Sequence, residues 1–329
     1  MTTRPHDALF KAVFGVPAHA AELCRAVLPR DVVDLLDLAT LEVEPSSFVD
    51  RELADTHGDL LLGVALLASA GRGSAAHALV YVLVEHQSRA SGDMPIRLLG
   101  YLGAIWRREL RAAPDGPLPL IIPVVVSHAP GGWTAPRSLR DMFGPDASTG
   151  PLANFRPWFR IIVEDLATLS NDDLVARVPA LVPRLTWWML RDARDPPRLL
   201  ANVATWAADL EAATRRDPAT LDQLLRYLTI ITDRSSLEQI HAKLRQHAPR
   251  TAEAAMTAGE ELIQQGLQQG LRQGLQQGLA GTLHKLLVQR FGPLTPAQSA
   301  RLAAASPAQL DRALDRILLA PTADGVFED

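Results

Sequence analysis

The sequence contains a single cysteine among its 329 residues, and aromatic residues make up only 5% of the chain. Cys24 cannot form a disulfide within the chain, which fits a reducing compartment. The most apolar segment, Leu118 to Val126, is interrupted by Pro119 and Pro123 and is far too short to cross a membrane. The N-terminal region carries Asp7 and lacks a continuous apolar stretch, so no secretory signal is expected. These absences predict a cytoplasmic protein with no membrane partner.

An excess of positive charge is also absent. The chain has 33 Lys and Arg against 37 Asp and Glu, a net charge of −4, and 47% apolar residues that can build a core. The overall charge therefore gives no bulk attraction to nucleic acid, and any binding must come from a local basic patch and a bound metal. Two expected helical segments carry arginine clusters, each interpreted first as an ordinary solvated helix face, with phosphate contact as the alternative. The clusters are Arg97, Arg107, Arg108 and Arg111, and Arg184, Arg191, Arg194 and Arg198.

Two apolar stretches meet acidic residues at their ends. The first runs from Leu60 to Leu67 directly after Asp59, and the second from Ala78 to Val84 directly before Glu85. The glycine-containing segment 70–74 between them predicts a turn, so the two stretches form an antiparallel hairpin. This pairing brings Asp59 beside Glu85. Two neighbouring carboxylates at the ends of apolar strands repel each other and favour a cation with oxygen ligands, Mg²⁺ or Mn²⁺.

Gln87 lies two residues after Glu85 and therefore belongs to the same strand face. Its amide could orient a water or a phosphate oxygen at the metal. A simpler interpretation stays open, in which Asp59 pairs with Arg51 or Arg97 and the end of the second strand is polar without holding a ligand.

An aspartate on one strand, followed at the end of the next strand by an acid, any residue and a third polar residue, resembles the signature of the PD-(D/E)XK nuclease superfamily. Within that superfamily, four strings resemble the recombination-promoting nuclease (Rpn) group, which is also described as a YhgA-like transposase family. The resemblance covers residues 5–190 approximately and resumes in a glycine-repeat tail. The strings are Pro5-His6-Asp7-Ala8-Leu9-Phe10-Lys11, His57-Gly58-Asp59-Leu60-Leu61, Leu83-Val84-Glu85-His86-Gln87-Ser88 and Met94-Pro95-Ile96-Arg97-Leu98-Leu99-Gly100-Tyr101.

The resemblance implies a metal-dependent endonuclease that hydrolyses phosphodiester bonds in DNA, with a link to recombination or mobile elements. It implies that Asp59, Glu85 and the backbone carbonyl of His86 hold the metal, which polarises the scissile phosphate and activates a water. The third motif position is usually lysine in the superfamily, whereas here it is Gln87, and an amide supplies only a dipole to the transition state. The alternative is a catalytically weak or inactive nuclease-fold protein that binds nucleic acid or serves as an oligomeric scaffold.

Five further residues are candidates for roles near this site. His6 and Asp7 lie at the start of an expected helix, where capping is the simpler role and approach to the metal is the alternative. Arg97 and Tyr101 are one turn apart on another expected helix and could both face the site. His128 follows a buried strand, where a loop contact is the simpler role and metal ligation the alternative.

Strands that alternate with helices predict an α/β fold, namely a PD-(D/E)XK nuclease-like core with a mixed central sheet flanked by helices, followed by an all-α C-terminal region. Besides the hairpin, strands are expected at 41–44, 119–127 and 159–163, and Glu164 and Asp165 are expected to cap the next helix. The expected parts are a nuclease-like core at 1–180, a helical extension at 181–250, a repeat helix or linker at 251–281 and a small helical domain at 282–329.

The segment from Gln264 to Leu279 repeats glycine and leucine every four residues. Its four glycines cost a helix roughly 1 kcal/mol each relative to alanine, so the helix needs a partner. Leucine rows beside glycine rows allow close helix contact and predict a homo-oligomer formed through residues 259–281, with a frayed linker as the alternative. Downstream, Gly292-Pro293 is expected to end a helix, and Thr295-Pro296 and Ser306-Pro307 to begin two more.

Overall fold

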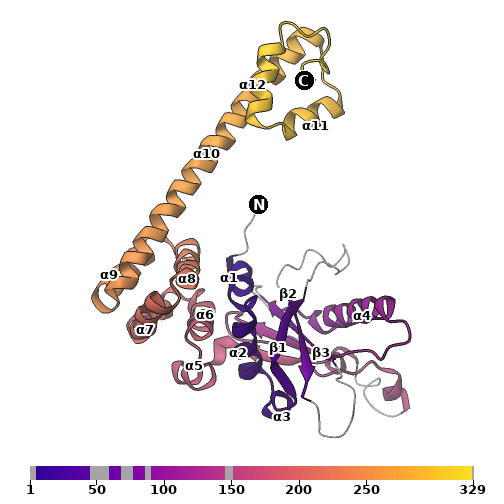
Figure 1. The fold of residues 1–329 in the computed structure, drawn as a ribbon, viewed down its shortest axis with the longest axis vertical. Coiled ribbons are helices and arrows are strands. Elements are labelled where there is room, and N and C mark those ends of the chain that lie inside the picture. Colours follow the sequence, from indigo (N-terminus) through magenta and orange to yellow (C-terminus); the bar gives the residue numbers. More distant parts are fainter. Residues whose placement is uncertain (1–4, 45–58, 68–76, 86–89, 145–150, 328–329) are drawn as a thin grey trace. The chain divides into compact units, whose positions relative to one another are not determined.

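The computed structural model of the chain describes residues 5–44, 59–67, 77–85, 90–144 and 151–327 (Figure 1). The chain divides into two compact units, Met1–Met256 and Thr257–Asp329, which we call the first and second units. The four expected parts of the chain stay a prediction.

A five-stranded mixed sheet forms the centre of the first unit (Figure 1). Its strands lie side by side in sequence order; β1, β2 and β3 are antiparallel neighbours, while β3, β4 and β5 run parallel. The predicted hairpin and mixed sheet are both confirmed. The strands are β1 (Leu36–Glu44), β2 (Asp59–Leu66), β3 (His77–Glu85), β4 (Leu120–Ser127) and β5 (Ile162–Asp165).

The last strand begins three residues later than the expected 159–163. Its pairing with β4 starts only where Ile162 meets Val124, and Ile161 packs in a hydrophobic cluster instead of joining the ladder. The expectation that both acids after this strand cap a helix is half right. Asp165 accepts a hydrogen bond from the backbone of Ala167 and caps the short helix η4 (Leu166–Thr168). Glu164 instead forms an ion pair with Arg177 of α5 (Asn171–Arg177).

Helices cover both faces of the sheet. The helix α4 (Met94–Ala112) packs its apolar side, with Leu98 and Ile105, against Leu61 and Val125. On the opposite face Leu62 is fully buried, α2 packs on β1, and α1 packs on α2 and on α6 (Leu181–Asp192). Both faces are therefore apolar, which explains the nearly continuous hydrophobic strands. The N-terminal helices are α1 (Pro5–Phe14), α2 (Pro17–Val27) and α3 (Arg30–Val33).

The remainder of the first unit is helical, as predicted, in the part of the chain that the structure describes. Trp188 stacks on Trp206 with ring centroids 5.6 Å apart, and both belong to the core. The elements are α5 (Asn171–Arg177), α6 (Leu181–Asp192), α7 (Pro196–Arg216), α8 (Pro218–Ile231) and α9 (Arg234–His247), with short helices η1 (Leu139–Met142) and η3 (Pro151–Phe155) between β4 and β5.

A single helix, α10 (Pro249–Phe291), runs through the whole glycine repeat. It ends at Gly292, whose φ of 87° suits glycine, as the sequence predicted. Two capped helices follow, α11 (Pro296–Ala304) and α12 (Pro307–Arg316), each with the predicted hydroxyl at its cap. They pack on the end of α10 around a second core that includes Leu287 and Leu310.

Candidate active site

The candidate site lies at one edge of the sheet, where β2 begins and where β3 and β4 end (Figure 1). Asp59 is the first residue of β2 and is paired with Leu83. Glu85 is the last residue of β3 and is paired with Ser127, the last residue of β4. Ser127 is in turn paired with Asp165 at the end of β5. One edge of the sheet therefore gathers polar positions from four strands.

The strand register also decides which face each position belongs to. Directly paired residues share a face, as do residues two apart on one strand. Position 85 is two residues beyond Leu83, the partner of Asp59, so positions 59 and 85 share a face. Diagonal neighbours of this kind in an antiparallel pair are typically about 7–8 Å apart. The same face includes Leu61, which packs beneath α4.

The structure describes only the backbone of Asp59 and of β3, and His86 and Gln87 lie outside the described residues. The expected metal ligands Asp59, Glu85 and His86, and the catalytic role of Gln87, therefore stay predictions. The described residues contain no group of three or more His, Cys, Asp or Glu that could hold a metal.

Asp165 and Ser127, at the same edge of the sheet, accept hydrogen bonds from nearby backbone N–H groups. Asp165 accepts a hydrogen bond from the backbone N of Trp133 at 2.6 Å through Oδ2, and one from Ala167 N at 3.2 Å through Oδ1. A Cβ at Gly132 would come within 2.9 Å of that Oδ2, and φ is 87° there, so only glycine fits this approach. Ser127 Oγ accepts from Ala129 N at 3.2 Å. These contacts fix the turn that follows β4 at the site.

A cluster of rings joins α1 to the end of β4. His6 Nδ1 lies 2.7 Å from Tyr227 Oη on α8, and the His6 ring centroid lies 4.9 Å from that of His128. His128 directly follows β4 and is 2% exposed. Burial raises the pKa of Tyr227 above its ordinary value, so the phenol keeps its proton. His6 thus lies beside the strand that ends at the candidate edge, and metal ligation by His6 or His128 stays a prediction.

The other accessory candidates are Asp7 on α1 and Arg97 and Tyr101 on α4. The helix α1 begins at Pro5, so Asp7 lies inside its first turn and not at its cap position. Asp7 is buried, with one oxygen 3.9 Å from Lys11 Nζ. On α4, Tyr101 is fully buried in the hydrophobic cluster between this helix and the sheet, whereas Arg97 is half-buried. Their expected approach to the metal stays a prediction.

Three arginines of the second cluster pair with carboxylates of the same unit and so do not form an ordinary solvated face. Arg184 pairs with Asp209 at 2.8 Å. Arg191 is buried and pairs with Asp192 at 2.6 Å, and Arg198 lies 3.1 Å from the same carboxylate. Internal carboxylates therefore hold these guanidiniums, which the sequence pattern did not reveal because their partners depend on how α6 and α7 pack.

The first cluster is more accessible. On α4, Arg108 pairs with the neighbouring Glu109 at 2.7 Å, while Arg107 and Arg111 are exposed.

Sequence reasoning missed Tyr227, because its contact with His6 spans 221 residues and no local pattern marks it. No helix in the described ranges is both long and apolar enough to span a membrane.

Comparison with known proteins places the chain in a family. The family model described as "Putative transposase, YhgA-like" matches residues 4–218, more than half of the chain. The chain is a member of the YhgA-like transposase family. No solved structure matches it significantly.

Curated relatives of this YhgA-like protein carry nuclease names. It is 28% identical over 264 residues to recombination-promoting nuclease RpnD of Escherichia coli O157:H7, across 79% of this chain and 95% of that protein. It is 26% identical over 276 residues to recombination-promoting nuclease RpnA of E. coli K12, across 80% and 85%. A third relative, the inactive recombination-promoting nuclease-like protein RpnE of E. coli K12, is 27% identical over 265 residues, across 80% and 83%. The relatives of the chain thus include proteins named as nucleases and a protein named as inactive.

Proposed function

We propose that this YhgA-like protein is a metal-dependent DNA endonuclease that hydrolyses phosphodiester bonds, with a link to recombination or mobile elements. The observation that carries the proposal is the strand register, in which positions 59 and 85 share one edge and one face of the sheet. The order helix, three antiparallel strands, helix and parallel strand supports a PD-(D/E)XK nuclease-like core. Relatives named as recombination-promoting nucleases support DNA as the substrate.

In this proposal Mg²⁺ or Mn²⁺ is held by Asp59, Glu85 and the backbone carbonyl of His86. Carboxylate and carbonyl oxygens are the donors that these hard cations prefer, so the residue types fit the metal. The bound cation would supply charge stabilisation at the scissile phosphate and a more acidic water. Gln87 would orient a water or a phosphate oxygen, and Arg97 would add positive charge from the first turn of α4.

The test is cleavage of supercoiled plasmid by the purified full-length chain in Mg²⁺, in Mn²⁺ and in a chelator. Asp59→Ala and Glu85→Ala are the site variants. Glu42→Ala is the matched control, because it removes an exposed carboxylate from β1 of the same sheet. We expect metal-dependent nicking by the wild type and the control, and its loss in both site variants. Tryptophan fluorescence confirms that each variant is folded.

Two outcomes would contradict this function. Nicking that survives in Asp59→Ala and Glu85→Ala would come from a contaminant or from other residues. Absence of nicking under every metal would favour the second candidate function, a catalytically inactive nuclease-fold protein that binds nucleic acid or acts as a scaffold. The relative RpnE of E. coli K12, which is named as inactive, supports that candidate. Gel-shift binding of DNA without cleavage would identify it.

We also propose that the chain forms a homo-oligomer through residues 259–281 of α10. The side chains of Leu267, Leu271 and Leu275 are between 55% and 66% exposed, and an added Cβ at Gly270 or Gly274 would meet nothing within 4 Å. An apolar row beside an open glycine row allows a second helix to approach closely. Analytical ultracentrifugation tests this with Leu271→Gln/Leu275→Gln and with deletion of 259–281. An unchanged mass in both would refute the pairing.

A further inference from the structure

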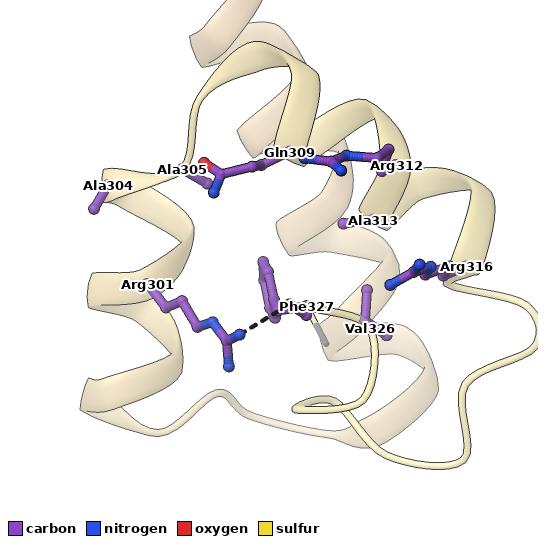
Figure 2. Close-up of a pocket in the computed structure, with 9 residues that line it drawn as sticks. All are labelled: Arg301, Ala304, Ala305, Gln309, Arg312, Ala313, Arg316, Val326 and Phe327. Carbon is purple, nitrogen blue, oxygen red and sulfur yellow. Dashed lines mark hydrogen bonds between the residues drawn. The ribbon is translucent and has the colours of Figure 1, made fainter. Parts of the chain in front are cut away.

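A pocket opens in the second unit between α11, α12 and the segment that follows α12 (Figure 2). Its volume is about 320 Å³, at the lower end of the usual range for small-molecule sites. The floor is apolar, because Ala305, Ala313 and Val326 are all buried there. Such a floor suits the flat or aliphatic part of a ligand.

Three arginines surround this floor. Arg312 and Arg316 are one turn apart on α12, and Arg301 stands on α11 at the opposite side of the pocket (Figure 2). None of the described residues that line the pocket is acidic. Three guanidiniums of like charge around one cavity create a positive potential that favours an anion. Each guanidinium has five N–H donors, so a contact with protein leaves donors for a ligand.

Two side chains of this pocket, Arg301 and Gln309, are already held in place. Arg301 donates to the backbone O of Phe327 at 2.8 Å, and its Cζ lies 5.3 Å from the centroid of the Phe327 ring, which points into the pocket (Figure 2). Gln309 accepts from Ser306 N at 2.8 Å through Oε1, which leaves its Nε2 as a further donor at the rim. A ligand would meet these donors with little loss of side-chain freedom.

We infer that this pocket binds a nucleotide phosphate, with the phosphate held by Arg312 and Arg316 and the base against the Phe327 ring. The guanidinium fork matches two phosphate oxygens at once, and several such forks suit a dianion better than one carboxylate. Bases stack on aromatic side chains without regard to sequence. The nucleotide is either free or at the phosphorylated end of a single strand, since both present the same chemistry. The inference does not depend on the metal site, so the two can fail separately.

Calorimetric titration of the full-length chain tests the inference. The probes are deoxyadenosine monophosphate, deoxyadenosine, inorganic phosphate, and an oligothymidine with either a 5′-phosphate or a 5′-hydroxyl. We expect the monophosphate to bind about tenfold or more tightly than the nucleoside, since charged hydrogen bonds are lost without the phosphate. A preference for the 5′-phosphorylated strand over the free nucleotide identifies a strand end as the ligand, and equal affinity identifies the nucleotide itself.

Arg312→Gln/Arg316→Gln should weaken the monophosphate about tenfold or more. Lys285→Gln is the matched control, because Lys285 is exposed on α10 and does not line the pocket. Phe327→Leu should weaken the monophosphate and leave inorganic phosphate unchanged. Circular dichroism establishes that the variants keep their helices.

Three results would overturn the inference. The first is no binding of any probe by the wild type at about 1 mM, the limit of weak specific affinity. The second is equal loss in the pocket variant and in Lys285→Gln. The third concerns Glu328 and Asp329, the acidic residues that follow Phe327 in the sequence. If only a chain that ends at Phe327 binds the monophosphate, the pocket serves the chain's own carboxylates.

Discussion

Replacement of Asp192 by asparagine is expected to destabilise the first unit by about 3–5 kcal/mol, the usual cost of removing one partner from a buried ion pair. Asp192 is fully buried at the end of α6. Its Oδ1 accepts from Arg191 Nε at 2.6 Å, and its Oδ2 accepts from Arg191 Nη2 at 2.9 Å and Asn202 Nδ2 at 2.7 Å. Arg198 Nε lies 3.1 Å from Oδ1. One carboxylate therefore balances a buried guanidinium and ties α6 to α7.

Asparagine keeps the shape of this side chain but removes its charge. One of its two terminal atoms becomes an NH₂ group that faces other donors, so at least one of these hydrogen bonds is lost. The side chain of Arg191 is only 1% exposed and stays charged. The loss is therefore that of an uncompensated buried cation, which is larger than that of an ordinary hydrogen bond.

Urea unfolding followed by tryptophan fluorescence measures this loss. All tryptophans lie between Trp106 and Trp206, so the signal reports on the first unit alone. With a slope of about 3 kcal/mol per M, the midpoint should fall by about 1–2 M. Glu238→Gln is the matched control, because Glu238 pairs with Arg234 on α9 with both side chains largely exposed. The control should lose less than about 0.5 kcal/mol.

A double variant separates the charge from the shape. Arg191→Gln with Asp192→Asn removes both charges, and its midpoint should recover part of the loss seen in Asp192→Asn. The reasoning is refuted if Asp192→Asn shifts the midpoint no further than Glu238→Gln does. It is also refuted if the double variant is less stable than Asp192→Asn alone.

Three further outcomes follow from the described contacts. Burial raises the pKa of Cys24 from 9.0 to about 12, so the thiol of the unfolded chain loses its proton first as the pH rises. The free energy of unfolding should therefore fall by about 1.4 kcal/mol per pH unit between about pH 9 and 12. Urea unfolding at several pH values should show a smaller slope for Cys24→Ala. Thr295→Ala removes a capping box at α11 and should cost about 1 kcal/mol, measured by chemical unfolding followed by circular dichroism, whereas the exposed Ser299→Ala should cost much less. Gly274→Ala adds a Cβ that meets no atom of its own chain within 4 Å but lies on the glycine row through which a second α10 is proposed to approach, so it should lower the mass in analytical ultracentrifugation; an unchanged mass with a gain of up to about 1 kcal/mol in stability would show that no second helix covers this face.

Local patterns in the sequence predicted much of the backbone. The two apolar stretches around the glycine-containing segment predicted the hairpin of β2 and β3, and the register confirms that Asp59 and Glu85 occupy its two ends. The hydroxyl residues before Pro296 and Pro307 predicted the caps of α11 and α12. Each of these signals acts within a few residues, which is why a single sequence carries it.

Side-chain partnerships were not predictable in the same way. The arginines of α6 and α7 looked like a solvated face, yet Arg191 is buried against Asp192, because burial depends on which helices pack together. The contact of His6 with Tyr227 joins residues 221 positions apart. The repeat in α10 was compatible with a linker or a helix, since the helical cost of four glycines is close to what neighbouring residues can offset.

The sequence by itself determined the order of strands and helices, the position of the two acids at the ends of a hairpin, and the family to which those residues are similar. Periodicity, turn residues and caps act locally, so they are legible without a fold. Only the tertiary structure decided that positions 59 and 85 share a face with the core beneath α4, that Asp165 holds the turn after β4, and that three arginines surround one pocket in the second unit. These relations depend on register and packing between distant segments, which bring together residues that no local pattern connects.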